Sequence, residues 1–211
     1  MTDLASLALF LAAAVVIAVT PGPGILYVAA RTLAGGRGEG IASSLGTGLG
    51  GLVHVLAGAL GVSALVMASA EAFTALKFAG AAYLVWLGLK TIREARRVEA
   101  APADVRAAGA GRAFREGVVV EALNPKTAAF FLAFIPQFVS PAEGSVALQF
   151  VILGLISVTL NTLVDLAVAF VAARARDGLV RRPTLIRRLR EASGVVMCGL
   201  GASLALTRRA A

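Results

Sequence analysis

The chain has few of the residues on which soluble enzymes and secreted proteins rely. Its 211 residues include one cysteine, Cys198, and one histidine, His54. A single cysteine excludes an intramolecular disulfide and a two-cysteine redox relay, and one His with one Cys cannot build a zinc site. The sequence also lacks a nucleophile elbow, a phosphate-binding loop and a metalloprotease motif. We therefore expect a protein that is not an enzyme and that needs no cofactor or metal.

Charged residues are scarce as well. They make up 15% of the chain, whereas about 25% is usual in a soluble domain, and hydrophobic residues make up 58%. Several apolar runs reach the roughly 20 residues that a helix needs to cross a bilayer. The composition therefore predicts an all-α polytopic membrane protein. The net charge of +8 comes from arginines between the apolar runs, which is typical of membrane orientation and not of nucleic-acid binding.

We expect a single transmembrane domain, residues 1–211, with six spans. The predicted spans cover residues 4–33, 40–68, 72–89, 114–138, 146–173 and 192–207. The sixth is only about 16 residues long, so five spans are the alternative. Asp3 and the absence of a basic region before Leu4 favour a retained first span over a signal peptide.

The distribution of arginine predicts the orientation of the chain. The loops that follow spans one, three and five hold two, six and seven arginines, and the longest of them is the linker at residues 93–113. The opposite side has only Lys77, Arg208 and Arg209. Basic residues favour the cytoplasmic side, so the arginine-rich side is predicted to be cytoplasmic, with both termini outside.

Two interruptions within apolar runs are the most informative stretches. The first is Thr20-Pro21-Gly22-Pro23-Gly24 and the second is Asn124-Pro125-Lys126. Proline removes a backbone donor and breaks a helix, and freed backbone groups in lipid need protein, water or a ligand as partners. We therefore expect the two breaks to face each other across a cavity. The alternatives are a simple packing kink at the first and a local helix cap at the second.

The two halves of the chain follow the same plan. Each has a proline-broken span, then a long span with polar residues near its middle, then a shorter span. Because each half has three spans, the halves would have opposite orientations, and a 3+3 inverted repeat with broken helices one and four is a known transporter design. In this register His54 lies near Asn161. The alternative is the vague hydropathy similarity of any membrane protein.

The first break offers partners for both ends of an amino acid. The N–H groups near Gly24 and Ile25, at the start of the second half-helix, suit a carboxylate. Carbonyls freed before Pro21 suit an ammonium group. The segment Thr20–Gly24 is therefore predicted to bind substrate, together with Asn124, Pro125 and Lys126 of the second break and with His54 and Asn161. For His54 a hydrogen bond between helices is the alternative.

Three ionisable residues lie inside apolar runs, where charge is costly. Lys126 is expected to contact Glu121, Asp165 or the carboxylate of a substrate. Because an apolar environment favours the neutral form of a carboxyl group, Glu121 and Asp165 are candidates for proton coupling. Ordinary ion pairs with Arg115 and Arg174 at the membrane edge are the alternatives.

Several segments together resemble the LysE/RhtB family of bacterial amino-acid exporters. They are the TPGP segment at residues 20–23, the Arg37-Gly38 loop with the Gly-rich span that follows, residues 76–84, residues 124–131 and residues 136–138. The resemblance covers nearly the whole chain, in order and at normal spacing. It implies a small exporter of amino acids in the bacterial inner membrane, coupled to the proton gradient, with an amino acid, protons and the bilayer as partners. Separately, the helix faces with small residues permit a homodimer without requiring one.

Departures from the family pattern bear on the substrate. Gly51 stands where many relatives have an acidic residue. Phe130 stands where the branch that exports lysine and arginine has an acidic residue. Their loss favours a neutral substrate of the threonine, homoserine or leucine kind. Glu121 is the reverse departure and keeps export of basic amino acids as an alternative. A membrane metal-ion or redox transporter of the same superfamily is a further alternative, which the single Cys and His disfavour.

Overall fold

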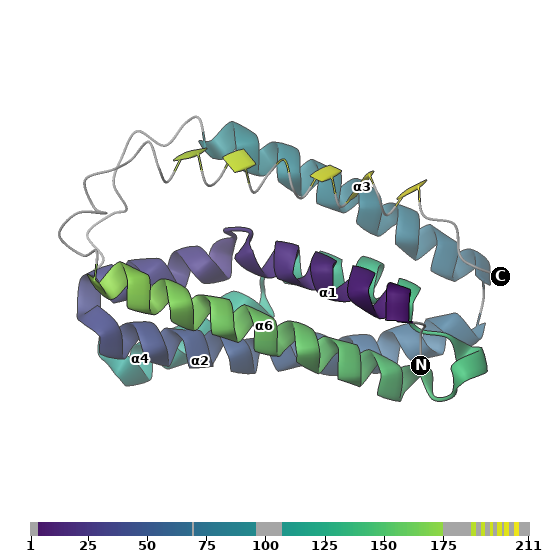
Figure 1. The fold of residues 1–211 in the computed structure, drawn as a ribbon, viewed down its shortest axis with the longest axis horizontal. Helices are drawn as coiled ribbons and strands as arrows, with labels where there is room; N and C mark the ends of the chain where they lie inside the picture. The colour runs from purple at the N-terminus through teal and green to yellow at the C-terminus, as the bar shows by residue number, and fades with distance from the viewer. Residues whose placement is uncertain are drawn as a thin grey trace.

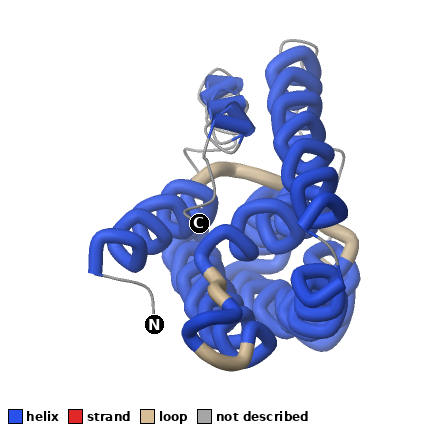
Figure 2. Tube along the Cα trace, turned by 90° about the vertical axis from the view of Figure 1, so that its right-hand side faces the viewer, coloured by secondary structure: helices blue, strands red, loops and turns tan. Residues whose placement is uncertain are grey.

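The apolar runs of the sequence form helices that lie along one long axis (Figure 1). The computed structural model describes residues 4–68, 70–95 and 107–174, and isolated residues between 187 and 206. These residues form helices joined by short connections, without a strand, as the view along the bundle shows (Figure 2). The predicted all-α class is confirmed for this part of the chain. About half of the sixth predicted span, 192–207, and about half of the linker at 93–113 lie outside the described residues.

The first predicted span is broken where the prolines predict it. Helix α1 (Leu4–Val19) ends before Thr20, and helix α2 (Pro23–Ala68) begins at Pro23. The predicted loop between spans one and two is wrong, because α2 continues through it with a kink at Gly36, whose φ of 78° is not helical. A positive φ suits glycine, which has no Cβ to clash, so one residue suffices where a loop was expected. The chain turns back at this kink (Figure 1).

The second predicted break is also present. Helix α4 (Ala110–Ala122) ends before Leu123 and Asn124, and the short helix α5 (Pro125–Ala129) follows. The chain then widens into a π-helical turn, η1 (Phe130–Phe134), and tightens into a 3₁₀ turn, η2 (Ile135–Phe138). Pro136 explains this irregularity, because it lacks an N–H and its ring displaces the carbonyl four residues earlier.

The remaining described helices match their predicted spans with shifted ends. Helix α3 (Ala70–Ala95) is longer than predicted at both ends. The 3₁₀ turn η3 (Pro141–Glu143) and Gly144, with a φ of 110°, form the predicted turn before helix α6 (Val146–Arg174). The kink of α2, the start of α4 and the end of α6 lie at one end of the bundle, and both breaks lie near the middle of its long axis (Figure 1).

Small residues allow α2 to pack directly on α4. A Cβ added at Gly46 would collide with the backbone of Phe114, and one at Gly50 would collide with the carbonyl of Val118. From the other side, a Cβ at Gly117 would lie 2.7 Å from the carbonyl oxygen of Ser43. Gly46 and Gly50, four residues apart on one face of α2, therefore form a close helix contact, and α4 is its partner.

The exposed surface is apolar, and polar side chains gather inside. On α2, Leu45, Leu49, Val53, Leu56 and Leu60 are exposed at helical spacing, while small polar residues of the same helix are buried. Among the described residues, three helical segments are long and apolar enough to cross a bilayer: Pro23–Gly61, Ala110–Phe138 and Val146–Arg174. The chain is therefore a helical membrane protein with exposed leucines along α2 and with buried polar residues beside a larger apolar core.

Candidate functional site

The first break leaves the end of α1 short of backbone partners. The backbone N–H of Thr20 donates to the carbonyl of Ile17 at 3.3 Å, three residues back instead of the four of a regular α-helix. The Thr20 hydroxyl turns back and donates to the carbonyl of Val16 at 2.6 Å. Beyond the break, Leu26 N–H donates to the carbonyl of Gly22 at 3.0 Å, so the new helix is established within one turn. Pro23 fits its first position because the missing N–H would have no partner there.

The second break is capped by its own side chain. Asn124 Oδ1 accepts from the backbone N–H of Lys126 at 3.0 Å, and Pro125 occupies the first position of α5. The backbone N–H of Asn124 donates to the carbonyl of Glu121 at 3.0 Å, which closes the end of α4. The helix cap that the sequence predicts at Asn124 is confirmed.

Lys126 links the second break to the first. Its Nζ donates to the carbonyls of Ile17 and Thr20, at 3.0 and 2.8 Å, and the residue is only 5% exposed. The expected contact with Glu121 or Asp165 is wrong, because the freed carbonyls of α1 reach the ammonium group first. The carbonyls at the first break do bind an ammonium group, as the sequence predicted, but this group is Lys126 Nζ of the same chain.

Glu121 is the hub of the polar cluster. Its Oε2 accepts from Asn124 Nδ2 at 2.9 Å and its Oε1 accepts from the Thr127 hydroxyl at 2.6 Å. His54 Nε2 donates to its backbone carbonyl at 2.8 Å. The predicted alternative of a hydrogen bond between helices is thus confirmed for His54. Glu121 is 7% exposed, and its carboxylate binds uncharged donors of the second break in place of the Arg115 partner considered from sequence.

Glu121 also approaches the first break. A Cβ added at Gly24 would lie 2.6 Å from Glu121 Oε2 and 3.8 Å from Asn124 Nδ2. A larger residue at this position would displace the Glu121 carboxylate, so glycine allows the start of α2 to lie directly against the second break. The two breaks are side by side, as the sequence predicted.

Asp165 on α6 faces Thr47 on α2. The Thr47 oxygen lies 2.7 Å from Asp165 Oδ2 and 2.8 Å from the carbonyl oxygen of Ser44. A threonine hydroxyl has one proton to donate. When Asp165 is ionised, Thr47 can donate to only one of these two acceptors. When Asp165 carries a proton, it donates to Thr47, Thr47 donates to Ser44, and both contacts become hydrogen bonds.

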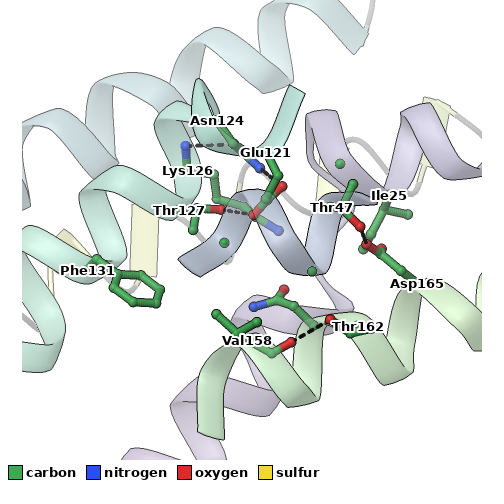
Figure 3. Close-up of a pocket in the computed structure, with 14 residues that line it drawn as sticks. Ile25, Thr47, Glu121, Asn124, Lys126, Thr127, Phe131, Val158, Thr162 and Asp165 are labelled. Atoms are coloured by element: carbon green, nitrogen blue, oxygen red, sulfur yellow. Dashed lines mark hydrogen bonds between the residues drawn. The ribbon is translucent and has the colours of Figure 1, made fainter. Parts of the chain in front are cut away.

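A narrow pocket lies between these groups (Figure 3). It is bounded by α2, the second break with α5 and η1, and α6, and Glu121, Lys126, Thr47 and Asp165 reach it from different elements (Figure 3). Its free space is enough for about one water molecule. The structure therefore describes a closed form, in which a larger molecule enters only when the lining helices separate.

The sequence predicted part of this lining. Six of the predicted site residues line the pocket: Gly24, Glu121, Asn124, Lys126, Asn161 and Asp165. The other six do not, namely Thr20, Pro21, Gly22, Pro23, His54 and Pro125. Thr20, Gly22 and the three prolines form the breaks themselves. His54 lies outside the pocket lining and donates a hydrogen bond to the backbone carbonyl of Glu121.

Other lining residues were missed. They are Thr47, Gly48, Gly51, Thr127, Phe131, Val158 and Thr162, whereas Ile25, which the sequence placed next to the substrate carboxylate, also lines the pocket. The signal for Thr47, Gly48 and Gly51 was present, because they belong to the small-residue stretch of the second predicted span. Nothing local distinguishes Val158 or Thr162 from other apolar or hydroxyl residues of α6. Among the described residues, no three His, Cys, Asp or Glu side chains gather as a metal site.

A second polar network closes the arginine-rich end. Arg31 of α2 pairs with Glu116 of α4, and the Tyr27 hydroxyl donates to the Ala113 carbonyl at 2.9 Å. Next to the kink, Glu39 Oε1 accepts from the backbone N–H groups of Ala108 and Gly109, at 2.7 and 2.6 Å, where α4 begins. Both contacts tie α2 to the start of α4. Charged and polar contacts therefore join α2 to the start of α4 at this end of the bundle.

Buried ionisable groups at paired helix breaks, within a bundle whose outer face is apolar, define a membrane transporter. The model of the LysE type translocator family matches residues 15–208, and the chain belongs to this family of transporters. The recognised family resemblance is thereby confirmed.

Relatives cover nearly the full length of the chain. A homoserine/homoserine lactone efflux protein of Salmonella typhimurium is 31% identical over 95% of this chain and 96% of its own. A threonine efflux protein of Escherichia coli is 29% identical over 92% of this chain and 94% of its own. An uncharacterised membrane protein of Vibrio cholerae is 31% identical over 94% and 96%. No solved structure gives a significant match.

Proposed function

We propose that the protein exports small neutral amino acids across the bacterial inner membrane and couples export to the proton gradient. The observation that carries the proposal is the pocket between the two helix breaks, which brings the buried carboxyl groups of Glu121 and Asp165 next to the start of α2. The relatives named for homoserine, threonine and leucine efflux support this substrate class.

The pocket has complements for both ends of a zwitterion. Gly24 and Ile25 line it in the first turn of α2, where backbone N–H groups have no partner within the helix and attract an anion. These groups suit the carboxylate of an amino acid. Because Lys126 already occupies the carbonyls at the end of α1, the ammonium group of the substrate belongs next to Glu121 and Asp165.

Glycines opposite α6 limit the side chain that the pocket accepts. Gly48 faces Thr162 and Gly51 faces Val158, at 2.6 and 3.0 Å from where a Cβ would lie. Neither glycine provides a charge, and Val158 is apolar, so a short neutral side chain fits best between them. A basic substrate is the second candidate, because the pocket lining carries two carboxyl groups and one lysine.

For the proton step we propose Asp165, with Glu121 as the second carboxyl group. The Thr47 hydroxyl forms both of its short contacts as hydrogen bonds only when Asp165 is protonated. Loss of the proton therefore changes the contact between α2 and α6, which are two walls of the pocket. Protonation of Asp165 thereby changes the packing of α2 against α6 at the proposed substrate site.

The proposed topology is one transmembrane domain of six spans in a 3+3 inverted repeat. The arginine-rich end, with the kink of α2 and the start of α4, is cytoplasmic, and both termini are outside. The close packing of α2 on α4 uses small residues within one chain. A homodimer is compatible with the exposed apolar faces and is not required by them.

A panel of labelled amino acids, loaded into proteoliposomes, tests the substrate class. We expect efflux of threonine, homoserine or leucine to be fastest and to rise when a pH gradient is imposed. Preferential efflux of lysine or arginine would favour the second candidate. No efflux of any amino acid would refute the proposed function.

Asp165→Asn tests the proton step separately from binding. An asparagine amide can donate to Thr47 as a protonated Asp165 would, but it cannot release a proton. We expect exchange of labelled for unlabelled substrate to continue while accumulation driven by a pH gradient disappears. Thr47→Val should weaken the same gradient response and Thr47→Ser should retain it. Normal gradient-driven accumulation by Asp165→Asn would show that this residue carries no coupling proton.

A further inference from the structure

The end of α1 has the features of a cation site. The last carbonyl groups of a helix have no partner within it, and they carry a partial negative charge. In transporters with broken helices, such half-helix ends and unwound carbonyls coordinate sodium ions or protons. Here the carbonyl of Thr20 and that of Ile17, which also accepts from the Thr20 N–H, point at one atom, Lys126 Nζ, from 2.8 and 3.0 Å.

The methylene stem of Lys126, as well as its ammonium group, packs closely against the first break. A Cβ added at Gly22 would lie 3.1 Å from both Lys126 Cδ and Cε and 3.3 Å from Nζ, so the absent side chain of Gly22 leaves the passage for the lysine stem. Lys126 is 5% exposed. None of the ion pairs between described residues includes it, so carbonyl oxygens are the groups in direct hydrogen-bond contact with the ammonium, while the carboxyl groups of Glu121 and Asp165 act on its charge from a greater distance.

We propose that the Lys126 ammonium is a tethered occupant of a monovalent-cation site at the end of α1, and that it performs the structural role that a bound sodium ion performs in other broken-helix transporters. The site itself follows from the contacts of Lys126. Its consequence for transport, that export does not require sodium, rests on the proposed function.

A tethered cation has one advantage over a free ion. It is part of the chain, so its presence at the site does not depend on the concentration of any ion in solution. The two breaks are then joined through the membrane interior regardless of the sodium concentration. Removing the side chain should convert this permanent occupant into a site that depends on an added cation.

Chemical rescue tests the proposal without any substrate. Lys126→Ala removes Cγ, Cδ, Cε and Nζ, and propylammonium reproduces these four atoms. In thermal unfolding of the purified variant, we expect saturating propylammonium to raise the melting temperature by about 5 °C, with a smaller rise for sodium and none for choline at equal ionic strength. The melting temperature of the wild-type protein should not respond.

Two matched variants make the test specific. Lys126→Met fills the same passage without a charge, so propylammonium should not stabilise it. Gly22→Ala combined with Lys126→Ala narrows the passage and should weaken the rescue. If Lys126→Ala unfolds in detergent, recovery of folded protein when propylammonium is present during solubilisation supports the proposal, and no recovery refutes it.

Other results would overturn the proposal. They are the absence of stabilisation of Lys126→Ala by propylammonium, or equal stabilisation of Lys126→Met. A wild-type efflux rate that falls when choline replaces sodium would overturn the consequence for transport. Failure of the amino-acid panel would refute the proposed function alone, because the unfolding measurements need no transported substrate.

Discussion

The two helix breaks obtain their hydrogen-bond partners in different ways. At the second break, Asn124 caps the following helix, and Glu121 binds Asn124 and Thr127, so most partners come from within seven residues, and His54 of α2 adds one hydrogen bond to the Glu121 carbonyl. At the first break, the carbonyls of Ile17 and Thr20 accept from Lys126, more than a hundred residues away. The second break is therefore stabilised mainly by its own residues, and the first depends on the second.

This difference assigns the two breaks different roles. The prolines and glycines of the first break open the helix and leave space, as the close approach of Gly24 to Glu121 indicates. The polar and charged side chains of the second break fill that space. Substitutions at the second break should accordingly disturb both breaks, whereas substitutions at the first should act more locally.

Glu121→Ala should have the largest effect. It leaves Asn124 Nδ2 and the Thr127 hydroxyl buried without this acceptor, and an unsatisfied buried group costs about 1–3 kcal/mol. We expect the free energy of unfolding to fall by about 3 kcal/mol and efflux to be lost, as measured by thermal unfolding and proteoliposome assays. Glu121→Gln keeps one acceptor and should be milder. Equal stability of Glu121→Ala and the wild-type protein would contradict the hub role.

Gly50→Ala should have the next largest effect, because a Cβ there collides with the carbonyl of Val118 and lies 3.0 Å from Glu121 Cβ. Overpacking of this kind costs about 1–3 kcal/mol. Gly61→Ala is a matched control on the same helix, since no atom lies within 4 Å of its added Cβ, and it should be neutral or slightly stabilising. Similar melting temperatures for the two variants would argue against direct packing of α2 on α4.

Thr20→Val should have a smaller effect, confined to the first break. It removes the hydroxyl that donates to the Val16 carbonyl, at a cost of about 1 kcal/mol, and keeps the size of the side chain. Thr20→Ser retains the donor and should remain close to wild type in thermal unfolding. If Thr20→Val cost as much as Glu121→Ala, the proposed dependence of the first break on the second would be wrong.

Arg112→Ala should have the smallest effect. The Arg112 side chain is 65% exposed and pairs with Glu116 one helical turn away at 2.7 Å, and exposed pairs of this kind contribute about 0.3–0.5 kcal/mol. Glu116 also keeps Arg31 as a partner. A loss of efflux in Arg112→Ala, with normal stability, would place a transport role at this end of α4 that the pocket does not explain.

Local features of the fold could be predicted from sequence. Pro21, Pro23 and Pro125 fix where helices stop and start, because each lacks an N–H wherever it stands. Asn124 before Pro125 predicts a cap from two adjacent residues. The spacing of Gly46 and Gly50 predicts a close helix contact, although it does not identify α4 as the partner.

Contacts between distant helices could not be predicted. Thr47 and Asp165 are 118 residues apart, and their meeting depends on the rotation of α2 and α6 about their axes. The target of Lys126 was missed for a different reason. Sequence reasoning paired its charge with a carboxylate, whereas in the structure the broken end of α1 presents carbonyl groups at a shorter distance. The sequence predicts a loop at the turn near Gly36, because the polar and glycine residues around it do not show that a single glycine with positive φ makes the turn.

Protection of pocket residues from chemical labelling tests most directly whether the two breaks enclose the substrate. In a Cys198→Ser background, Ile25→Cys reports on the first break and Val158→Cys on the facing wall of α6, with Ser145→Cys in the exposed turn as a control. We expect a transported amino acid to slow maleimide labelling of Ile25→Cys and Val158→Cys and to leave labelling of Ser145→Cys unchanged. Equal labelling of Ile25→Cys and Val158→Cys with and without saturating substrate would contradict a binding site between the breaks.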